Sequence, residues 1–540
     1  MIRKNDRVHI TIEDYSVEGH GIAKVDGYVL FVPEGAVGDE AIVHVLKCRS
    51  SFGYAKIEQL IHPSPARIQS DCAVSRSCGG CSFRHINYTA ELAAKANKVK
   101  NDLSRIGGIT EPPMTEALGA DNTTGYRNKA QYPIRMQQGK ITAGFYAAGS
   151  HRVIACENCR IQPDIFDKLL SFTLEFIQKY DLSVYDEQTG KGLVRHLYLR
   201  RGEKSGEIMV CLVLNGNKFP KEFLSELTTA FPDVKCVCIN ENREKTNVIL
   251  GKNTRFLTDR TYIIDSLLGK EFAISPASFY QVNPIQTERL YAKAAELADV
   301  QSTETVLDLY CGIGTVGMCA AANAKHLVGI EIVPEAVENA TANAKRNGLT
   351  NTRYICADAK QGVARLHKEG YRFDTVFIDP PRKGCDNETL ETLVAMAPKK
   401  LVYISCDPAT LARDIKYLTA GGFALQSATP VDLFPRTAHV ETVVLLSQRR
   451  PDTHIDIKLD LSELDITSAE TKATYQEIKD YVLDKHGLKV STLYISQVKA
   501  KCGIIERENY NKGKEGHRVP KCPKEKEEAI MDALRNFRMI

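Results

Sequence analysis

Three side chains that could carry covalent chemistry lie at the ends of apolar runs in the second half of the chain. Asp379 follows the run 375–378, Cys406 comes just after the run 401–404, and Glu441 precedes the run 442–446. If these runs are strands of one open α/β sheet, their ends meet at the edge where such folds place active sites. A thiolate there is a good nucleophile, and a carboxylate can accept a proton. Taken singly, Cys406 could be a core residue and Glu441 a solvated one, so the combination predicts covalent catalysis.

A glycine-rich turn predicts a nucleotide-like ligand near the same edge. Residues 306–317 read as an apolar strand, a turn with Gly312 and Gly314, and a helix of small residues. Glycine lets the backbone approach a ligand, and Glu331, at the end of the next strand, can accept both hydroxyls of a ribose. NAD and S-adenosylmethionine both fit this pattern. The sequence IDPPR at 378–382 decides for S-adenosylmethionine, because paired prolines can fix a loop that presents Asp379 to a flat base; the alternative is a structural turn.

Clustered cysteines indicate a metal site. Cys72, Cys78 and Cys81 are close in sequence, and two glycines between the last two permit a tight loop that brings three sulfurs together. Zinc and an iron–sulfur cluster are both compatible with the spacing. A fourth ligand must come from elsewhere, and Cys156 and Cys159 are the two candidates.

The elements needed to position these residues divide the chain into four parts. Residues 285–449 alternate helices with apolar strands, which predicts an α/β fold with a Rossmann-like, doubly wound sheet. Residues 1–60 show short β-rich runs broken by glycines, which predicts an OB-like β-barrel. We expect a central α+β domain at 61–284 and a C-terminal extension of unknown role at 450–540, with helical stretches near 472–486 and 523–537.

Composition excludes several classes of protein. The chain has 540 residues, 43% of them hydrophobic, a net charge of +4 and sixteen cysteines. These values exclude a disordered chain, a fibrous repeat and a small disulfide scaffold. No apolar run is long enough to span a membrane, and the start of the chain lacks the apolar segment of a signal peptide. We therefore expect a cytoplasmic protein with reduced cysteines and no membrane partner.

Charge is uneven along the chain. Residues 1–71 contain 8 basic and 10 acidic residues, whereas 72–160 contain 12 basic and 6 acidic ones. The second segment is therefore expected to contact phosphate, with Arg127, Lys129 and Arg135 as candidates. In the extension, the stretch 499–526 is also basic and could contact RNA; equally, the extension could be a helical module with structural cysteines at 502 and 522.

The motifs LDLYCGIGT, GIE, IDPPRKGCD, ISCDPATLARD and DLFPRTAHVE, in this order, closely resemble those of the RNA uracil-5-methyltransferases, which use S-adenosylmethionine. SPASFYQVN at 275–283 resembles the motif that precedes the family's methyltransferase domain, and residues 1–60 resemble the TRAM domain, an RNA-binding barrel. The resemblance implies a nucleophile at Cys406, a general base at Glu441 and a supporting role for Asp379. It implies that the cofactor S-adenosylmethionine is bound by Gln281, Tyr310, Gly312, Gly314, Thr315, Glu331 and Asp379.

The chemistry implied by the resemblance explains these residue types. Attack of the Cys406 thiolate at carbon 6 of uracil makes carbon 5 nucleophilic enough to take a methyl group, and Glu441 then removes the proton on carbon 5. A base-paired uridine cannot present both carbons, so we expect it to be flipped out of its stack. Phe279 is a candidate stacking wall for the flipped base, with core packing as the alternative.

The family's ribosomal RNA members imply the remaining assignments. Their four-iron cluster is held by three clustered cysteines and a distant fourth, which aligns Cys72, Cys78, Cys81 and Cys159 with a [4Fe-4S] cluster. The expected substrate is 23S rRNA, since transfer RNA members generally lack both the barrel and the cysteines, and we expect a monomer. The alternatives are a tRNA uridine-5 methyltransferase, an RNA cytosine-5 methyltransferase, which normally has a second cysteine where this chain has Asp-Pro-Pro-Arg, and a non-catalytic RNA-binding relic.

Overall fold

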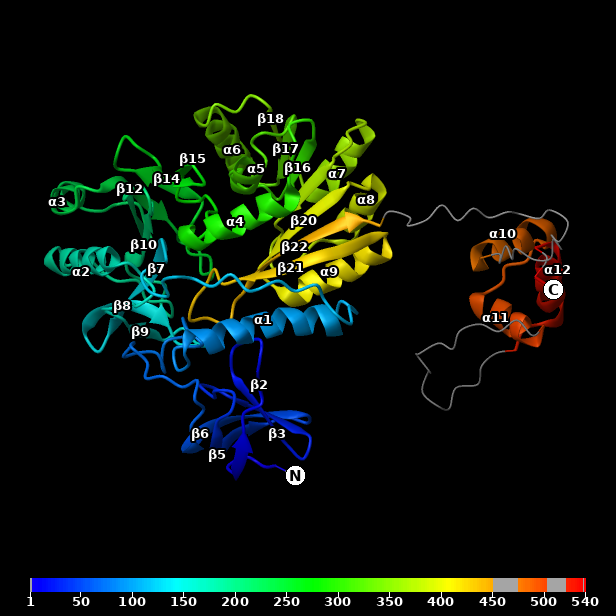
Figure 1. The fold of residues 1–540 in the computed structure, drawn as a ribbon, viewed down its shortest axis with the longest axis horizontal. Helices are drawn as coiled ribbons and strands as arrows, with labels where there is room; N and C mark the ends of the chain where they lie inside the picture. Colours follow the sequence, from blue (N-terminus) through cyan, green and yellow to red (C-terminus); the bar gives the residue numbers. More distant parts are fainter. Residues whose placement is uncertain (1, 450–473, 503–520, 538) are drawn as a thin grey trace. The chain divides into compact units, whose positions relative to one another are not determined.

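The protein is described from a computed structural model that covers residues 2–449, 474–502, 521–537 and 539–540 (Figure 1). The chain forms two compact units, Met1–Asp452 and Thr453–Ile540. Among the described residues, no helix is long and apolar enough to cross a membrane. Much of the basic stretch 499–526 lies outside the described residues, as does the start of the helical stretch near 472.

The first part of the larger unit is a six-stranded β-sheet with its own core. Its strands follow the order β1-β5-β6-β4-β3-β2. Side chains alternate along them, so that Ile10, Leu30, Val32 and Val43 are buried inside. The short β-rich runs expected in residues 1–60 are present as these strands. The strands are β1 (Arg7–Thr11), β2 (Asp14–Tyr15), β3 (Gly21–Val25), β4 (Tyr28–Val32), β5 (Glu40–Cys48) and β6 (Phe52–His62).

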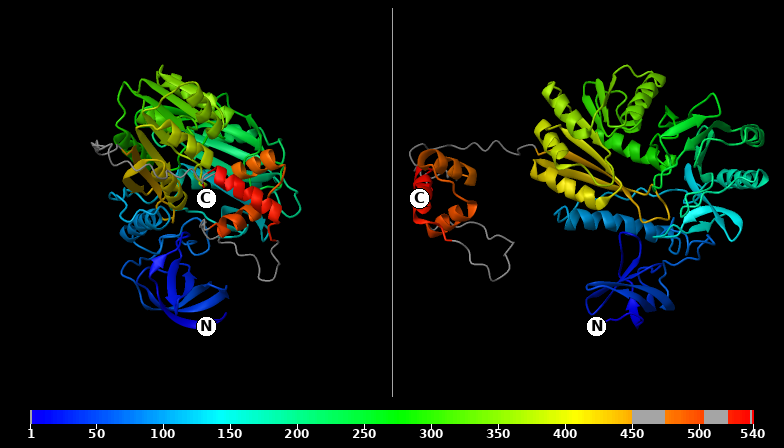
Figure 2. Two further views of the ribbon diagram at one scale, coloured as in Figure 1. Left: turned by 90° about the vertical axis from the view of Figure 1, so that its right-hand side faces the viewer. Right: turned by 180° about the vertical axis from the view of Figure 1, so that it is seen from behind.

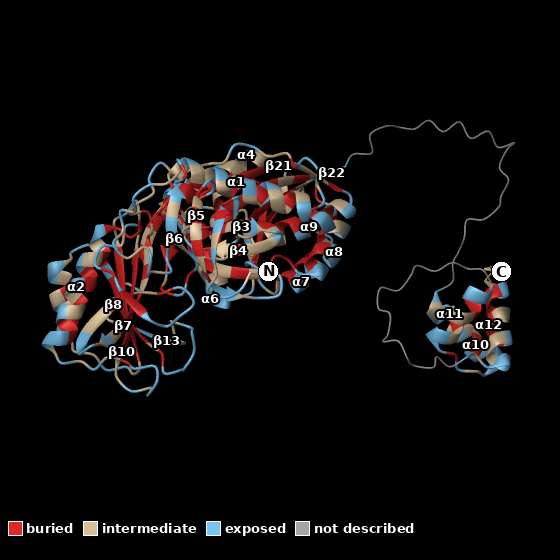
Figure 3. Cartoon of the chain, turned by 90° about the horizontal axis from the view of Figure 1, so that it is seen from below, coloured by how far each residue is buried: buried red, intermediate tan, exposed pale blue. Residues whose placement is uncertain are grey.

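The central part is a seven-stranded sheet in the order β13-β12-β11-β10-β7-β8-β9, with two helices packed against it. Its strands β10 and β11 are almost entirely buried, as Figure 3 shows for β10, because both faces of the sheet are covered. The predicted α+β organisation is present. The elements are β7 (Lys129–Gln137), β8 (Lys140–Tyr146), β9 (Val153–Ala155), α2 (Asp164–Lys179), β10 (Val194–Arg201), β11 (Ile208–Leu214), α3 (Glu222–Ala230), β12 (Val234–Glu241) and β13 (Asn253–Phe256), followed by the hairpin β14 (Ile263–Leu267) and β15 (Lys270–Ile274).

The third part is the doubly wound sheet that the sequence predicts. Five parallel strands run in the order β18-β17-β16-β19-β20, and the antiparallel strand β22 lies between β20 and β21. Val306 faces one core and its neighbour Leu307 the other, so each face of the sheet has its own helical layer. The elements are α4 (Pro284–Ala298), β16 (Thr305–Leu309), α5 (Thr315–Ala320), β17 (His326–Glu331), α6 (Pro334–Arg346), β18 (Thr352–Cys356), α7 (Ala359–Lys368), β19 (Thr375–Ile378), α8 (Asn387–Met396), β20 (Lys400–Ser405), α9 (Pro408–Ala420), β21 (Phe423–Val431) and β22 (Glu441–Gln448).

Helix α1 (Tyr88–Arg105) comes early in the chain but packs on this last sheet. Its buried residues Val99 and Leu103 belong to the core beneath α7, α8 and α9. Figures 1 and 2 show α1 (blue) lying along α9 (yellow). The segment that follows forms isolated β-bridges from Met114 and Leu118 to the edge strand β21. Residues 88–118 therefore belong structurally to the sheet formed by the end of the unit.

The smaller unit has three described helices around a small apolar core: α10 (Tyr475–His486), α11 (Thr492–Lys501) and α12 (Lys524–Asn536). Helix α10 begins with a capping box at Thr474 and ends at Gly487, whose left-handed backbone favours glycine. The helical stretches expected near 472–486 and 523–537 correspond to α10 and α12. Helix α11 was not expected, because its β-branched residues obscure the helical pattern.

Candidate active site

The three candidate catalytic residues lie at neighbouring positions on one edge of the doubly wound sheet. Asp379 directly follows β19, and Cys406 directly follows the adjacent strand β20. Because β22 is antiparallel to β20, pairing Ser405 with Thr442, its first residue Glu441 lies at the edge where β20 ends. The expectation that these residues meet at the sheet edge is therefore met by the topology.

The pKa of each of the three groups is raised, which favours its protonated, neutral form. Burial, with the charges of Glu441 and Asp379, raises the pKa of Cys406 to about 11. Burial and Asp379 raise the pKa of Glu441 to about 8, and loss of water contact raises the pKa of Asp379 to about 7. The guanidinium of Arg382 opposes these effects on Cys406 and Glu441. Shifted carboxyl and thiol groups that act on one another are typical of acid–base and nucleophilic sites.

The glycine-rich turn after β16 has the backbone that a ligand-binding loop requires. Gly312 and Gly314 have positive φ angles of 55° and 85°, and Tyr310 also adopts the left-handed region at 65°. A Cβ atom on Gly314 would lie 2.5 Å from the Met318 Cε atom, whereas the Cβ position at Gly312 is open. The left-handed backbone at Gly314 therefore favours glycine, and a larger residue there would also have to displace the end of the Met318 side chain.

Carboxylates hold this turn in place. Glu331, which ends β17, accepts hydrogen bonds from the backbone amides of Gly312 (3.1 Å) and Val333 (2.9 Å). Asp308 accepts one from the amide of Gly317 (2.8 Å), and burial raises the pKa of Asp308 to about 7. Glu331 thus joins the glycine turn to the end of β17, the place expected for ribose recognition.

The other candidate cofactor residues have partners of their own. The Thr315 hydroxyl is 3.2 Å from the Tyr291 hydroxyl, and the ring of Tyr310 packs against the core on the α7–α9 side. Gln281 is buried, and its backbone carbonyl accepts a hydrogen bond from the Asn128 side chain. The side chain of Phe279 is 66% exposed, so the core-packing alternative for this ring is wrong.

The clustered cysteines and the later pair line one cavity. Its volume is about 190 Å³, and its sulfur-bearing residues are Cys72, Cys78, Cys81, Cys156 and Cys159. In the described part of the chain, no group of three or more His, Cys, Asp or Glu side chains is arranged to hold a single metal ion. The cysteines are gathered around a space without forming a one-ion site.

The three cations expected to contact phosphate differ in availability. Arg135 forms an ion pair with Glu187 and a 3.0 Å hydrogen bond to Tyr146. Burial lowers the pKa of Lys129 to about 8, and Arg127 borders the cysteine cavity. Arg135 therefore has an internal role, which the sequence did not indicate.

A buried ion cluster next to the site was missed in the sequence. The Lys95 ammonium on α1 is 2.7 Å from carboxylate oxygens of both Glu91 and Asp432, and all three side chains are buried. Glu91 also accepts a hydrogen bond from the Arg436 backbone amide. The cluster therefore attaches α1 to residues 432–440, the loop that leads into Glu441. The i,i+4 spacing of Glu91 and Lys95 was visible but usually marks a solvated pair.

Comparisons with known proteins agree with this geometry. The family model described as tRNA (uracil-5-)-methyltransferase matches residues 87–449, and the TRAM domain matches residues 3–57. An uncharacterized RNA methyltransferase from Bacillus cereus is 42% identical over 449 residues, covering 83% of this chain and 98% of that protein. A similarly named protein from Listeria innocua is 43% identical over 450 residues, covering 83% and 99%.

A solved structure is also similar. It is the Pyrococcus abyssi tRNA (uracil-54, C5)-methyltransferase in complex with S-adenosyl-L-homocysteine, which aligns with a TM-score of 0.66 and 27% identity, over 81% of this chain and 100% of that chain. The family model ends at residue 449, so the smaller unit lies outside the match. With a TRAM domain at its start and this catalytic sheet, the chain belongs to the RNA (uracil-5-)-methyltransferase family of S-adenosylmethionine-dependent enzymes.

Proposed function

We propose that this protein methylates carbon 5 of a uridine in 23S rRNA through a covalent bond between Cys406 and carbon 6. The observation that carries the proposal is the placement of Asp379, Cys406 and Glu441 at adjoining ends of β19, β20 and β22. S-Adenosylmethionine supplies an electrophilic methyl group when bound. We assign its binding to Gln281, Tyr310, Gly312, Gly314, Thr315, Glu331 and Asp379.

The chain's own residues account for the rest of the reaction. The Cys406 sulfur forms a bond to carbon 6, which places electron density on carbon 5. Carbon 5 can then form its new bond to the methyl carbon while the bond from that carbon to the sulfonium sulfur breaks and its electron pair goes to that sulfur. Glu441 then takes the proton from carbon 5, and the electron pair of that bond re-forms the ring double bond as the sulfur leaves. In the order of the sheet, Asp379 at the end of β19 lies between the glycine-rich turn after β16 and Glu441 at the start of β22. We assign Asp379 to holding the edge of the uracil ring. The high pKa of Cys406 means that its proton must be removed before attack.

The choice of RNA rests on the parts outside the catalytic sheet. The barrel and the cysteine set support ribosomal RNA through their resemblance to the family's ribosomal RNA members. The second candidate is a tRNA uridine, which is favoured by the solved Pyrococcus enzyme, since that tRNA methyltransferase aligns over 81% of this chain.

The cysteine cavity offers several thiols to a metal centre. Five cysteines line a space of about 190 Å³, and thiolates are the ligands that hold iron–sulfur clusters. We assign Cys72, Cys78, Cys81 and Cys159 as ligands of a [4Fe-4S] cluster, with Cys156 as the other candidate for the fourth position. When bound, the cluster would crosslink the 72–81 loop to the segment around Cys159.

Trapping tests the catalytic assignment. The protein and S-adenosylmethionine are mixed with 23S rRNA or tRNA transcripts containing 5-fluorouridine, whose carbon 5 cannot lose a proton, and the complex is analysed by mass spectrometry. We expect an adduct on Cys406 that is lost in Cys406→Ala and retained in the matched variant Cys356→Ala, an exposed cysteine. Absence of the adduct, or its survival in Cys406→Ala, contradicts the mechanism. An adduct with tRNA alone favours the second candidate.

Iron analysis tests the cluster separately. After anaerobic purification, Cys159→Ser should lose iron and sulfide, whereas Cys156→Ser should retain them. If Cys156→Ser loses iron and sulfide while Cys159→Ser retains them, Cys156 is the fourth ligand. Zinc in place of iron would overturn the assignment of an iron–sulfur cluster.

A further inference from the structure

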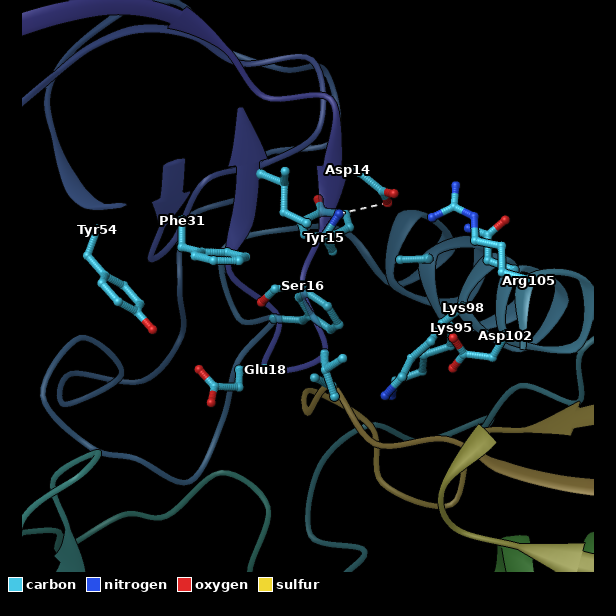
Figure 4. Close-up of a pocket in the computed structure, with 16 residues that line it drawn as sticks. Asp14, Tyr15, Ser16, Glu18, Phe31, Tyr54, Lys95, Lys98, Asp102 and Arg105 are labelled. Carbon is cyan, nitrogen blue, oxygen red and sulfur yellow. Dashed lines mark hydrogen bonds between the residues drawn. The ribbon is translucent and has the colours of Figure 1, made fainter. Parts of the chain in front are cut away.

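A second cleft lies between the barrel and α1, outside the catalytic edge. It has a volume of about 430 Å³, within the range of ligand-binding clefts. Figure 4 shows Phe31 and Tyr54 of the barrel on one side, charged side chains of α1 on the other, and the segment around Ser16 and Glu18 between them. None of the residues assigned above to catalysis, cofactor or metal lines this cleft.

The barrel wall of the cleft is aromatic. Strands β4 and β6 pair in parallel with Phe31 opposite Tyr54, and both rings alternate with buried core residues, so they lie on the outer face. Phe31 contacts Phe52 and Tyr54 at ring-centroid distances of 5.6 and 5.7 Å. A different pair of rings joins the barrel to the segment before α1: the ring centroids of Tyr15 and Phe83 are 5.1 Å apart. Half-exposed rings on the outside of such a barrel are suited to stacking with unpaired bases.

The helix wall is polar. Lys98, Asn101, Asp102 and Arg105 follow one another at helical spacing along α1, whereas Val99 and Leu103 on its other side enter the core. Cations at this position can contact phosphate, and amide and carboxylate groups can hydrogen-bond base edges.

The cleft leads toward the catalytic edge. Ala438, which lines it, lies three residues before Glu441. The charges of Asp407, directly after Cys406, and of Arg382 act on the Lys98 ammonium. An RNA strand whose uridine occupied the catalytic edge would therefore pass close to this cleft.

We propose that the cleft between the barrel and α1 binds an unpaired nucleobase next to the target nucleotide, stacked on Phe31 and Tyr54, with Lys98 and Arg105 contacting its phosphates. This inference rests on the proposed function. It assigns part of RNA selection to a base held outside the catalytic pocket, so the site requires an unpaired strand on at least one side of the methylated uridine.

Binding of defined RNAs tests the cleft. The probe is a short fluorescein-labelled single-stranded RNA of mixed sequence, compared with the same RNA annealed to its complement, and Kd is measured by fluorescence anisotropy. The double variant Phe31→Leu/Tyr54→Leu keeps apolar bulk but removes both rings. It should weaken single-strand binding on the order of tenfold and leave duplex binding unchanged. The matched control is Tyr417→Leu, which removes a partly exposed ring of α9.

A second variant and the trapping assay distinguish failure of this inference from failure of the proposed function. Lys98→Met/Arg105→Met should reduce the salt dependence of single-strand binding. Unchanged single-strand affinity in the ring variant, or an equal loss with duplex, overturns the inference. If wild-type protein forms the Cys406 adduct while the ring variant binds RNA normally, only this inference fails. If wild-type protein forms no adduct, the proposed function fails.

Discussion

Replacing Lys95 by methionine should destabilise the protein strongly and in a pH-dependent manner. Lys95 donates hydrogen bonds to Glu91 and Asp432 at 2.7 Å and to the Phe434 carbonyl at 3.2 Å. The variant leaves two buried carboxylates without their ammonium partner. Breaking a buried ion pair in this way typically costs about 3–5 kcal/mol of the free energy of unfolding.

The cost can be worked out from protonation. Burial already raises the pKa of Glu91 in the wild-type protein, and without Lys95 this carboxyl is expected to become neutral. Neutralising a glutamate of unfolded pKa about 4.3 at pH 7 costs about 3.7 kcal/mol, since one pKa unit corresponds to about 1.4 kcal/mol. At pH 5 the same step costs about 1 kcal/mol. Because the folded-state pKa is raised, the variant regains stability as the pH falls.

Urea unfolding of the variant and wild type at pH 7 and pH 5 measures these differences. The matched control is Lys24→Met, which removes an exposed ion pair with Glu13 and should change stability by less than about 0.5 kcal/mol. A loss of stability in Lys95→Met that is the same at both pH values would refute the explanation by buried carboxylates. Methyl transfer should also decrease at pH 7, because the loop before Glu441 loses its attachment to α1.

Three further predictions concern the catalytic edge. Since Glu441 must be deprotonated to act as the base and its pKa is about 8, the single-turnover rate should rise as the pH increases from 6 through about 8, and a rate independent of pH over that range would contradict this role. Arg382→Gln should raise the pKa of the Cys406 thiol, measured as an upward shift of the pH dependence of iodoacetamide alkylation, while Arg382→Lys should largely restore it. Gly314→Ala should weaken S-adenosylmethionine binding by at least about tenfold in calorimetry, because the added methyl meets Met318 in a left-handed backbone, and unchanged binding would show that the turn does not hold the cofactor.

The doubly wound sheet was predictable because its strands are apolar on both faces and end in residues with distinct chemistry. Strand β19 has the predicted boundaries, and Cys406 and Glu441 lie where the strand pattern placed them. Local sequence carries this information, since strand ends and glycine turns are defined within a few residues.

Contacts between distant segments could not be predicted in the same way. The sequence does not indicate that α1 packs on α9, because its buried face contains Glu91 and Lys95, which resemble a surface pair. Asp432, the partner that makes their burial possible, is more than three hundred residues away in the sequence. The cleft between barrel and α1 was missed for the same reason, as each wall is an ordinary exterior face when considered alone.

The position of β22 has a consequence for biosynthesis. It is the last strand of the larger unit, yet it inserts between β20 and β21, which precede it in the chain. A nascent chain that has been synthesised only to residue 440 contains the nucleophile but neither the base nor the strand that joins β21 to the sheet. The catalytic edge is therefore complete only after the whole of β22 has left the ribosome, so a chain that stops before residue 441 cannot carry out the proposed reaction.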